Sequence, residues 1–201
     1  MIPTQWVMTL AEAKTYLGLT GTAQDTALSA LLSLVTRQLE NYLELVFIKR
    51  DVSNEVYTVP YQFSCAFFIK QNLPVNSISK IELKDSSLAY VEKYGTTAGT
   101  DTFDYSKNGT VRRINSYIET RPDGVRVSYN GGLCTAIADI PDEIKAVAGN
   151  MLKLQWDVKF ANGGKIQSES LGDYSYTLAT ATDYPPFILT QLEALSAVKW
   201  Y

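Results

Sequence analysis

The sequence contains no histidine and only two cysteines among its 201 residues. Without histidine it cannot form a Ser-His-Asp triad, a Cys-His dyad or a zinc site with histidine ligands. Two cysteines are too few for an all-cysteine zinc site, which needs four thiolates. Cys65 and Cys134 lie far apart and outside any CxxC pair, so we expect two reduced, buried side chains rather than a disulfide.

Phosphate-binding motifs and long hydrophobic runs are also missing. The glycine pairs Gly131-Gly132 and Gly163-Gly164 fit neither GxGxxG nor GxxxxGK[ST], and they are better explained as breaks in the backbone. No run reaches the roughly 20 apolar residues of a membrane span. The segment after Met1, IPTQWVMTL, lacks the basic start and apolar stretch of a secretion signal. The sequence therefore predicts a soluble, cytoplasmic protein without membrane contact.

Positive charge is in slight deficit, with 18 Lys and Arg against 21 Asp and Glu and a net charge of -3. A protein that wraps nucleic acid needs a surplus of basic residues to neutralise phosphates, so this class is disfavoured. Passage of DNA through a neutral or acidic hole stays compatible with the composition. The 13 tyrosines are scattered and interleaved with acids, which indicates structural use rather than a ladder for stacking bases.

Carboxylates could still support glycoside hydrolysis, which requires two of them facing one cleft. Asp101 with Asp104, or Glu169 with Asp173, are the pairs available in polar loops. The first pair could equally be considered for calcium, although no complete ligand loop surrounds it. Solvated loop charge is the favoured interpretation, and we expect no catalytic residue, no metal and no cofactor.

Helical patterns occupy both ends of the chain. Thr9 and Glu12 have capping-box spacing, and Gly18 offers a stop for the helix that they begin. In the next helix, which Asp25 can cap, leucines and valines recur at steps of three and four residues. Pro141 fits the first position of a third helix. The predicted helices span about 9–17, 25–46, 141–160 and 186–200.

Short β-like runs separated by turn residues fill the middle of the chain, over about 54–130. Aromatic and β-branched residues dominate four strand candidates: Glu55 to Val59, Phe63 to Ile69, Lys80 to Lys84 and Val125 to Tyr129. Asp101 to Ile114 is expected to form a hairpin that turns at Asn108-Gly109. A further extended segment or hairpin is expected over about 165–178. The predicted class is α+β, a single domain over 1–201 in which terminal helices form a small bundle around a β-rich insertion.

Six segments in this order carry a family resemblance: TLAEAKTYLGL, DTALSALLSLVTRQLENYL, LPVNSISKIEL, VSYNGGL, IPDEIKAVAGNMLKLQW and SESLGDYSYTL. Together they resemble the head-tail connector (adaptor) proteins of long-tailed double-stranded DNA bacteriophages. The resemblance implies a structural protein of the virion that is assembled in the bacterial host cytoplasm. It implies a homo-oligomeric ring, dodecameric in the particle, beneath the portal protein. The ring would extend the channel through which double-stranded DNA passes and would contact a neck or tail-completion protein.

Residue roles follow from this resemblance as hypotheses. Aromatics at a chain end make compact anchors, so Phe187, Leu192, Trp200 and Tyr201 are the candidates for docking on the portal. The candidates for contacts between subunits are Met151, Trp156, Tyr174 and Tyr176. Two other functions stay open, namely another ring-forming neck or tail-completion protein and a carboxylate-dependent hydrolase of cell-wall sugars.

Overall fold

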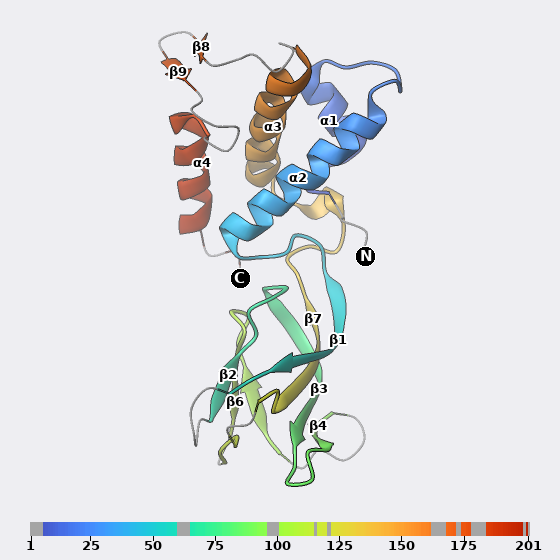
Figure 1. The fold of residues 1–201 in the computed structure, drawn as a ribbon, viewed down its shortest axis with the longest axis vertical. Helices are drawn as coiled ribbons and strands as arrows, with labels where there is room; N and C mark the ends of the chain where they lie inside the picture. Colours follow the sequence, from blue (N-terminus) through green and yellow to red (C-terminus); the bar gives the residue numbers. More distant parts are fainter. Residues whose placement is uncertain are drawn as a thin grey trace. The chain divides into compact units, whose positions relative to one another are not determined.

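The computed structural model describes residues 6–59, 65–95, 101–114, 116–119, 122–161, 168–171, 174–177, 184–198 and 200. These residues form an α+β protein with helices from both ends of the chain and strands from its middle, as predicted (Figure 1). The chain divides into two compact units. The helical unit takes residues 1–43 and 136–199, and the β unit takes 44–135 with 200–201. A single connector domain over 1–201 stays a prediction.

The helical unit contains four α-helices, two short helical turns and one pair of strands. In chain order they are α1 (Leu10–Leu17), α2 (Asp25–Leu43), η1 (Ile137–Asp139), α3 (Asp142–Trp156), η2 (Asp157–Ala161, a π-helix), β8 (Ser168–Leu171), β9 (Tyr174–Thr177) and α4 (Pro186–Ala197). Strands β8 and β9 pair antiparallel, which is the arrangement expected of a hairpin over 165–178. The proposed turn at Gly172-Asp173 lies outside the described residues.

The ends of α1 confirm the local prediction. The Thr9 side chain accepts from the Glu12 amide, and the Glu12 carboxylate accepts from the Thr9 amide at 2.6 Å. Gly18 ends the helix in the left-handed region, with φ 67°, where a residue without Cβ is least strained. Residues adjacent in sequence therefore determine where α1 begins and ends.

Helix α2 is shorter than predicted, because it ends at Leu43 and Glu44 adopts a φ of 53°. Val46 consequently lies outside the helix, and its amide donates to the Leu73 carbonyl. Of the predicted apolar stripe, Leu28, Leu31, Leu32, Val35 and Leu39 are buried, whereas Leu43 is half-buried and Tyr42 is exposed. Asp25 lies in the first turn rather than at the cap, and its carboxylate pairs with Lys14 at 2.5 Å.

The β unit is built from two antiparallel sheets. The four-stranded sheet has the order β1-β7-β3-β4, and the three-stranded sheet has the order β2-β6-β5. The strands are β1 (Arg50–Tyr57), β2 (Ala66–Phe68), β3 (Val75–Lys84), β4 (Tyr90–Tyr94), β5 (Phe103–Tyr105), β6 (Thr110–Arg113) and β7 (Val125–Gly131). The predicted hairpin over Asp101 to Ile114 is confirmed, since β5 pairs with β6 and Gly109 has a φ of 85°.

Strand prediction failed where side-chain alternation is weak. β1 and β3 begin before the predicted starts at Glu55 and Lys80, and β4 was not predicted. β4 pairs only with β3 and is largely half-buried. Such an edge strand has little contrast between an apolar and a polar face, so sequence alternation does not reveal it.

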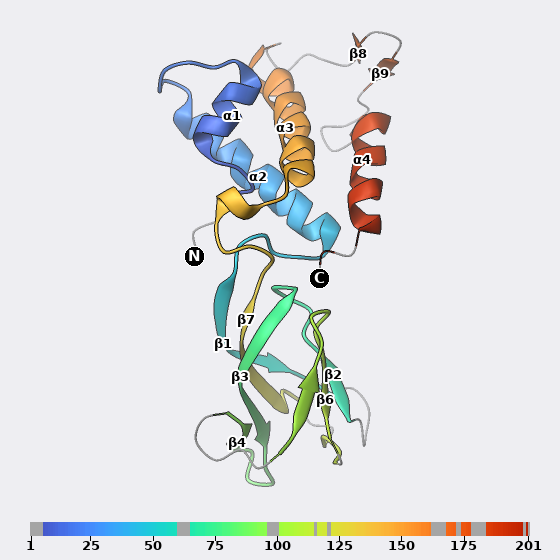
Figure 2. The same ribbon diagram turned by 180° about the vertical axis from the view of Figure 1, so that it is seen from behind.

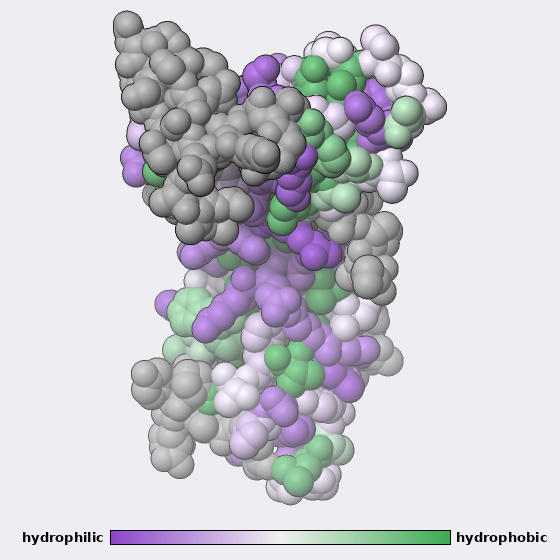
Figure 3. All heavy atoms as spheres, turned by 45° about the horizontal axis from the view of Figure 1, so that its top comes forward, coloured by the Kyte–Doolittle hydropathy of each residue, from purple (hydrophilic) through white to green (hydrophobic). Residues whose placement is uncertain are grey.

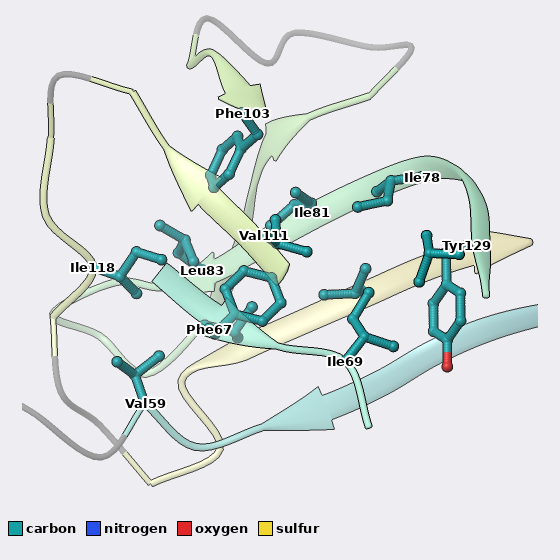
Figure 4. Close-up of a cluster of buried hydrophobic side chains, with 13 residues drawn as sticks. Val59, Phe67, Ile69, Ile78, Ile81, Leu83, Phe103, Val111, Ile118 and Tyr129 are labelled. Atoms are coloured by element: carbon teal, nitrogen blue, oxygen red, sulfur yellow. The ribbon is translucent and has the colours of Figure 1, made fainter. Parts of the chain in front are cut away.

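One hydrophobic core lies between the two sheets (Figure 4). Phe67 and Val111 come from the three-stranded sheet, while Ile81 and Val127 come from the four-stranded sheet, and all four are almost fully buried. Alternate residues of β7 are buried, as its period-two pattern predicts. The inserted strands thus bury their own core, which is the requirement for a compact unit.

Candidate interaction site

One of the carboxylates considered for catalysis, that of Asp101, is held in an ion pair. Asp101 accepts a hydrogen bond from the Arg113 guanidinium at 2.6 Å, and Asp104 lies opposite Arg112 in the β5–β6 hairpin. Asp173 lies outside the described residues, as does the side chain of Glu169. In the described part of the chain, no group of three or more His, Cys, Asp and Glu residues could hold a metal ion. The geometry therefore gives no support to a hydrolytic or calcium site at Asp101.

Both cysteines are free thiols, as predicted. Cys134 is buried, but the prediction of burial is wrong for Cys65, which is exposed. Cys65 stands just before the short strand β2 and does not enter the core between the sheets. Sequence alone could not separate the two, because each has one polar and one apolar neighbour.

The outer face of the four-stranded sheet carries a cluster of polar residues that pair with one another. The Glu82 carboxylate accepts two hydrogen bonds from Arg126, at 2.6 and 2.8 Å, and lies 3.3 Å from the Lys80 ammonium. The Arg126 guanidinium holds the pKa of Glu82 below its ordinary value, against the opposing effect of burial. Arg126 also stacks 4.2 Å from the centroid of the Tyr90 ring. These residues come from β3, β4 and β7, so they tie three strands together.

Tyr129 makes a second polar link at the edge of the β-unit core. Its hydroxyl donates to Glu55 at 2.6 Å and accepts from the Asn72 amide at 3.3 Å. Burial and the hydrogen bond to Glu55 raise the pKa of Tyr129 to about 12. The hydroxyl therefore stays protonated at neutral pH and acts as a structural donor.

The helical unit contains an open groove between α1 and α3. It is a hollow of about 500 Å³ with mainly apolar walls. Ala11 and Thr15 line it from α1, Ala146 lines it from α3, and all three are exposed. We call this hollow the α1–α3 groove. The lining also includes the larger side chains of Met8 and Tyr16 and the charged side chains of Glu12, Asp142 and Lys145.

An ion pair crosses this groove, whose lining also includes the exposed carboxylate of Asp142. Lys145 Nζ lies 3.1 Å from the Glu12 carboxylate. Partial burial would raise the pKa of Glu12, but hydrogen bonds from Thr9 and the ammonium of Lys145 hold it below its ordinary value. The two charges compensate each other at neutral pH. At one end, the Tyr16 ring packs so closely on Gly149 that a Cβ there would lie 2.5 Å from ring atoms.

Helix α4 is anchored through one face and leaves an apolar side chain accessible on each flank of that face. Ile188, Leu192 and Leu195 are buried, whereas Phe187 and Leu189 are 39% and 43% exposed. α4 follows Tyr184, whose hydroxyl donates to Gln38 at 2.6 Å and accepts from Gln155 at 3.0 Å. This network joins the start of α4 to α2 and α3. Figure 3 shows hydrophobic residues of the drawn face in small groups among hydrophilic and neutral ones.

The structure separates the residues that were predicted to dock on the portal. Phe187 is accessible on α4, whereas Leu192 is buried in the helical unit. Trp200 is half-buried and belongs to the β unit. Tyr201 lies outside the described residues. The buried Leu192 cannot belong to an exposed patch with Phe187, and the role of the four residues in docking stays a prediction.

The residues predicted to join subunits are also placed differently from one another. Met151 and Trp156 are buried in α3, and Trp156 stacks on Phe160 at 4.5 Å between ring centroids. Tyr174 and Tyr176 belong to β9, but their side chains lie outside the description.

The α1–α3 groove was not predicted from the sequence. The available signal was the small pair Ala11 and Thr15, four residues apart on one face of a predicted helix.

None of the helices in the described part of the chain has the length and apolar character needed to span a membrane. No curated protein sequence matches this chain. Residues 6–195 match the family described as head completion protein.

Solved structures with a similar fold include components of gene transfer agent (GTA) particles. One is described as the neck of an empty GTA particle computed with C6 symmetry (TM-score 0.63, 12% identity, 96% of this chain and 91% of that chain). Another is the neck of a native GTA particle computed with C12 symmetry (TM-score 0.62, 12% identity, 96% and 90%). A third is from the virion of a native GTA particle (TM-score 0.60, 15% identity, 96% and 91%). At these identities the similarity establishes the fold. Because the family match covers nearly the whole sequence, this chain belongs to the head completion protein family.

Proposed function

We propose that this protein is a ring-forming structural subunit at the head-neck junction of a tailed phage particle. The observation that carries the proposal is the family match over residues 6–195. The fold similarity to neck structures over 96% of the chain supports it. In this role the protein acts by binding its neighbours, without forming or breaking covalent bonds.

In the proposed particle, copies of the chain form a ring beneath the portal protein and extend the channel for double-stranded DNA. A twelve-fold ring would match the symmetry used for one similar neck structure. A ring with cyclic symmetry requires two different, complementary surfaces on each copy, which meet head to tail.

The charge of the chain is compatible with DNA passing through the ring without adhering to it. With a net charge of -3, the protein has no surplus of cations for phosphate neutralisation. We expect binding to linear duplex DNA to be undetectable at physiological salt, as measured by fluorescence anisotropy. Tight binding that weakens steeply with salt would contradict a channel role.

The ring is tested by solution mass followed by negative-stain electron microscopy, with and without the portal protein. The expected result is closed rings, either alone or once portal is added. A protein that stays monomeric under both conditions would contradict the proposal.

The position in the particle is tested by pull-down with purified portal protein and, separately, with tail-tube protein. Binding to portal is expected. Binding to the tail tube alone would indicate another neck or tail-completion protein. Phe187→Asp tests whether Phe187, an accessible residue among the predicted anchors, takes part in that binding.

A further inference from the structure

Leu88 combines high exposure with an unfavourable backbone conformation. It is 67% exposed, the largest fraction among the large hydrophobic side chains of the described residues. It lies in the turn that joins β3 to β4, and this turn forms one end of the β unit in both views (Figures 1 and 2). Its φ of 65° falls in the left-handed region, where a residue with a Cβ is strained. Single exposed apolar residues are common, but strain at the same residue needs a separate reason.

The other residues with this conformation show that Leu88 is the exception. Among the described residues, five that are not glycine have a positive φ. Four of them have polar or charged side chains: Glu44, Asn54, Asn72 and Asp123. Asn and Asp tolerate this region because their short polar side chains can bond to the local backbone, and a three-residue hairpin loop favours Gly at such a position. The local structure therefore does not account for leucine at position 88.

The turn is held in one conformation by the side chain of Asp85. Its Oδ1 atom accepts hydrogen bonds from the Ser87 amide at 2.8 Å, the Ser87 hydroxyl at 2.6 Å and the Ala89 amide at 3.1 Å. The Leu88 amide donates to the Asp85 carbonyl at 3.1 Å. Leu88 is thus presented to solvent from a fixed backbone, so a partner that binds it does not have to order the loop.

Charge and shape indicate a protein partner for this turn. Ser86, Ser87, Leu88 and Ala89 are exposed and uncharged. Beside them lies a hollow of about 410 Å³ whose lining carries charges of both signs, from Lys84, Lys93, Arg113, Asp85 and Glu119. A nucleic acid would require an excess of positive charge. A projecting apolar side chain instead gains by entering an apolar pocket.

A second copy of this chain is a poor source of that pocket. The α1–α3 groove has mainly apolar walls, but Glu12, Asp142 and Lys145 also line it. The hollow beside the turn is lined by the mixed charges described above. A leucine that entered either of these two hollows would take charged groups out of water, which costs free energy. A different protein is therefore favoured as the partner.

We infer that Leu88 is a docking residue that inserts into an apolar pocket of a different protein of the particle. This inference rests on the proposed function and adds to it a partner contact made by the β unit. Binding supplies the burial that the leucine lacks in the free chain, and this burial offsets the strain of its backbone.

Leu88→Asn in the full-length chain tests the inference, with purified portal protein and purified tail-tube protein as the two probes. Affinity for one of them, measured by biolayer interferometry, should fall by about tenfold or more, because the burial of a leucine side chain is lost. The thermal unfolding midpoint of the free variant should be unchanged or raised, since asparagine tolerates a positive φ. A residue that served only its own fold would give a lower midpoint.

Two variants provide matched controls. Leu88→Met keeps an apolar side chain of similar volume and should retain binding. Phe68→Thr removes another exposed apolar side chain of the β unit, on β2, where Phe68 is 58% exposed. It should leave the affinity for both probes unchanged, because threonine suits a strand and the turn is untouched.

The outcomes separate this inference from the proposed function. If rings form or portal binds, but neither probe responds to Leu88→Asn, the inference is overturned and the proposed function stands. A lower midpoint for Leu88→Asn would also overturn it, as would a loss of rings, which would assign the contact to another copy. If the wild-type protein forms no rings and binds neither probe, both fail.

Discussion

The helical unit and the β unit differ in how the side chains on their surfaces are paired. On the four-stranded sheet, Glu82, Arg126 and Tyr90 pair with one another across neighbouring strands. In the helical unit, the α1–α3 groove stays open and Phe187 and Leu189 remain accessible. A surface whose polar groups are already paired gains little from a partner, whereas exposed apolar surface gains by being covered. The β unit also exposes apolar side chains, since Leu88 is 67% and Phe68 58% exposed. The contrast therefore concerns the paired polar cluster and the open groove, and it does not assign contacts with other copies to one unit.

The largest expected effect tests whether the two units have separate hydrophobic cores and lose stability independently of each other. Ile81 in the β unit and Ile144 in the helical unit are both fully buried. Replacing either by alanine should lower the free energy of unfolding by about 2 to 5 kcal/mol, because a cavity is left. Amide hydrogen exchange read by mass spectrometry should show faster exchange mainly in the unit that carries the change. Equal loss of protection in both units would mean that they unfold as one, and the comparison would fail.

The next largest loss of stability is expected when the Glu82–Arg126 pair of the β unit is removed. Arg126→Ala should cost about 2 kcal/mol, because it leaves the nearly buried Glu82 carboxylate without its main partner. Arg112→Ala is the control at an exposed arginine of β6, and its effect should stay within about 0.5 kcal/mol. Urea denaturation measures both. Equal effects would show that the Glu82–Arg126 pair adds no stability.

The same pair predicts a pH dependence. Since the pKa of Glu82 is lowered in the folded protein, its ionised form stabilises the fold above the unfolded-state pKa. The contribution falls away as pH drops below the ordinary glutamate range and through the lower folded pKa. Glu82→Gln should therefore flatten the loss of stability in acid, as measured by urea unfolding between pH 7 and pH 3. An unchanged slope would exclude Glu82 as a source of acid sensitivity.

The smallest effect concerns a helix end beside the groove. Thr9→Ala removes the side-chain half of the capping box of α1 and should cost about 1 kcal/mol. Thr22→Ala, in the exposed loop before α2, is the matched control and should be near neutral. Thermal unfolding followed by circular dichroism compares the two. If Thr9→Ala also weakens ring assembly, α1 contributes to the contact between copies beyond its own stability.

Much of the fold followed from local patterns in the sequence. The capping box at Thr9, the stop at Gly18 and the turn at Gly109 were predicted, because each depends on residues close together in the chain. The apolar spacing identified the helices and the strand at Val125 for the same reason. Boundaries were less accurate: α2 ends at Leu43, because Glu44 turns the chain toward the β unit.

The sequence by itself determined the fold class, the absence of histidine chemistry and the family resemblance, since all three reside in composition and order. Tertiary structure alone decided which predicted anchors are accessible. Leu192 and Met151 are buried, whereas Phe187 is not, although all three stand in apolar helical patterns. It also created the α1–α3 groove from small residues more than 130 positions apart, such as Ala11 and Ala146. The physical reason is that periodicity marks which side of a helix is apolar, while burial depends on which neighbours cover that side.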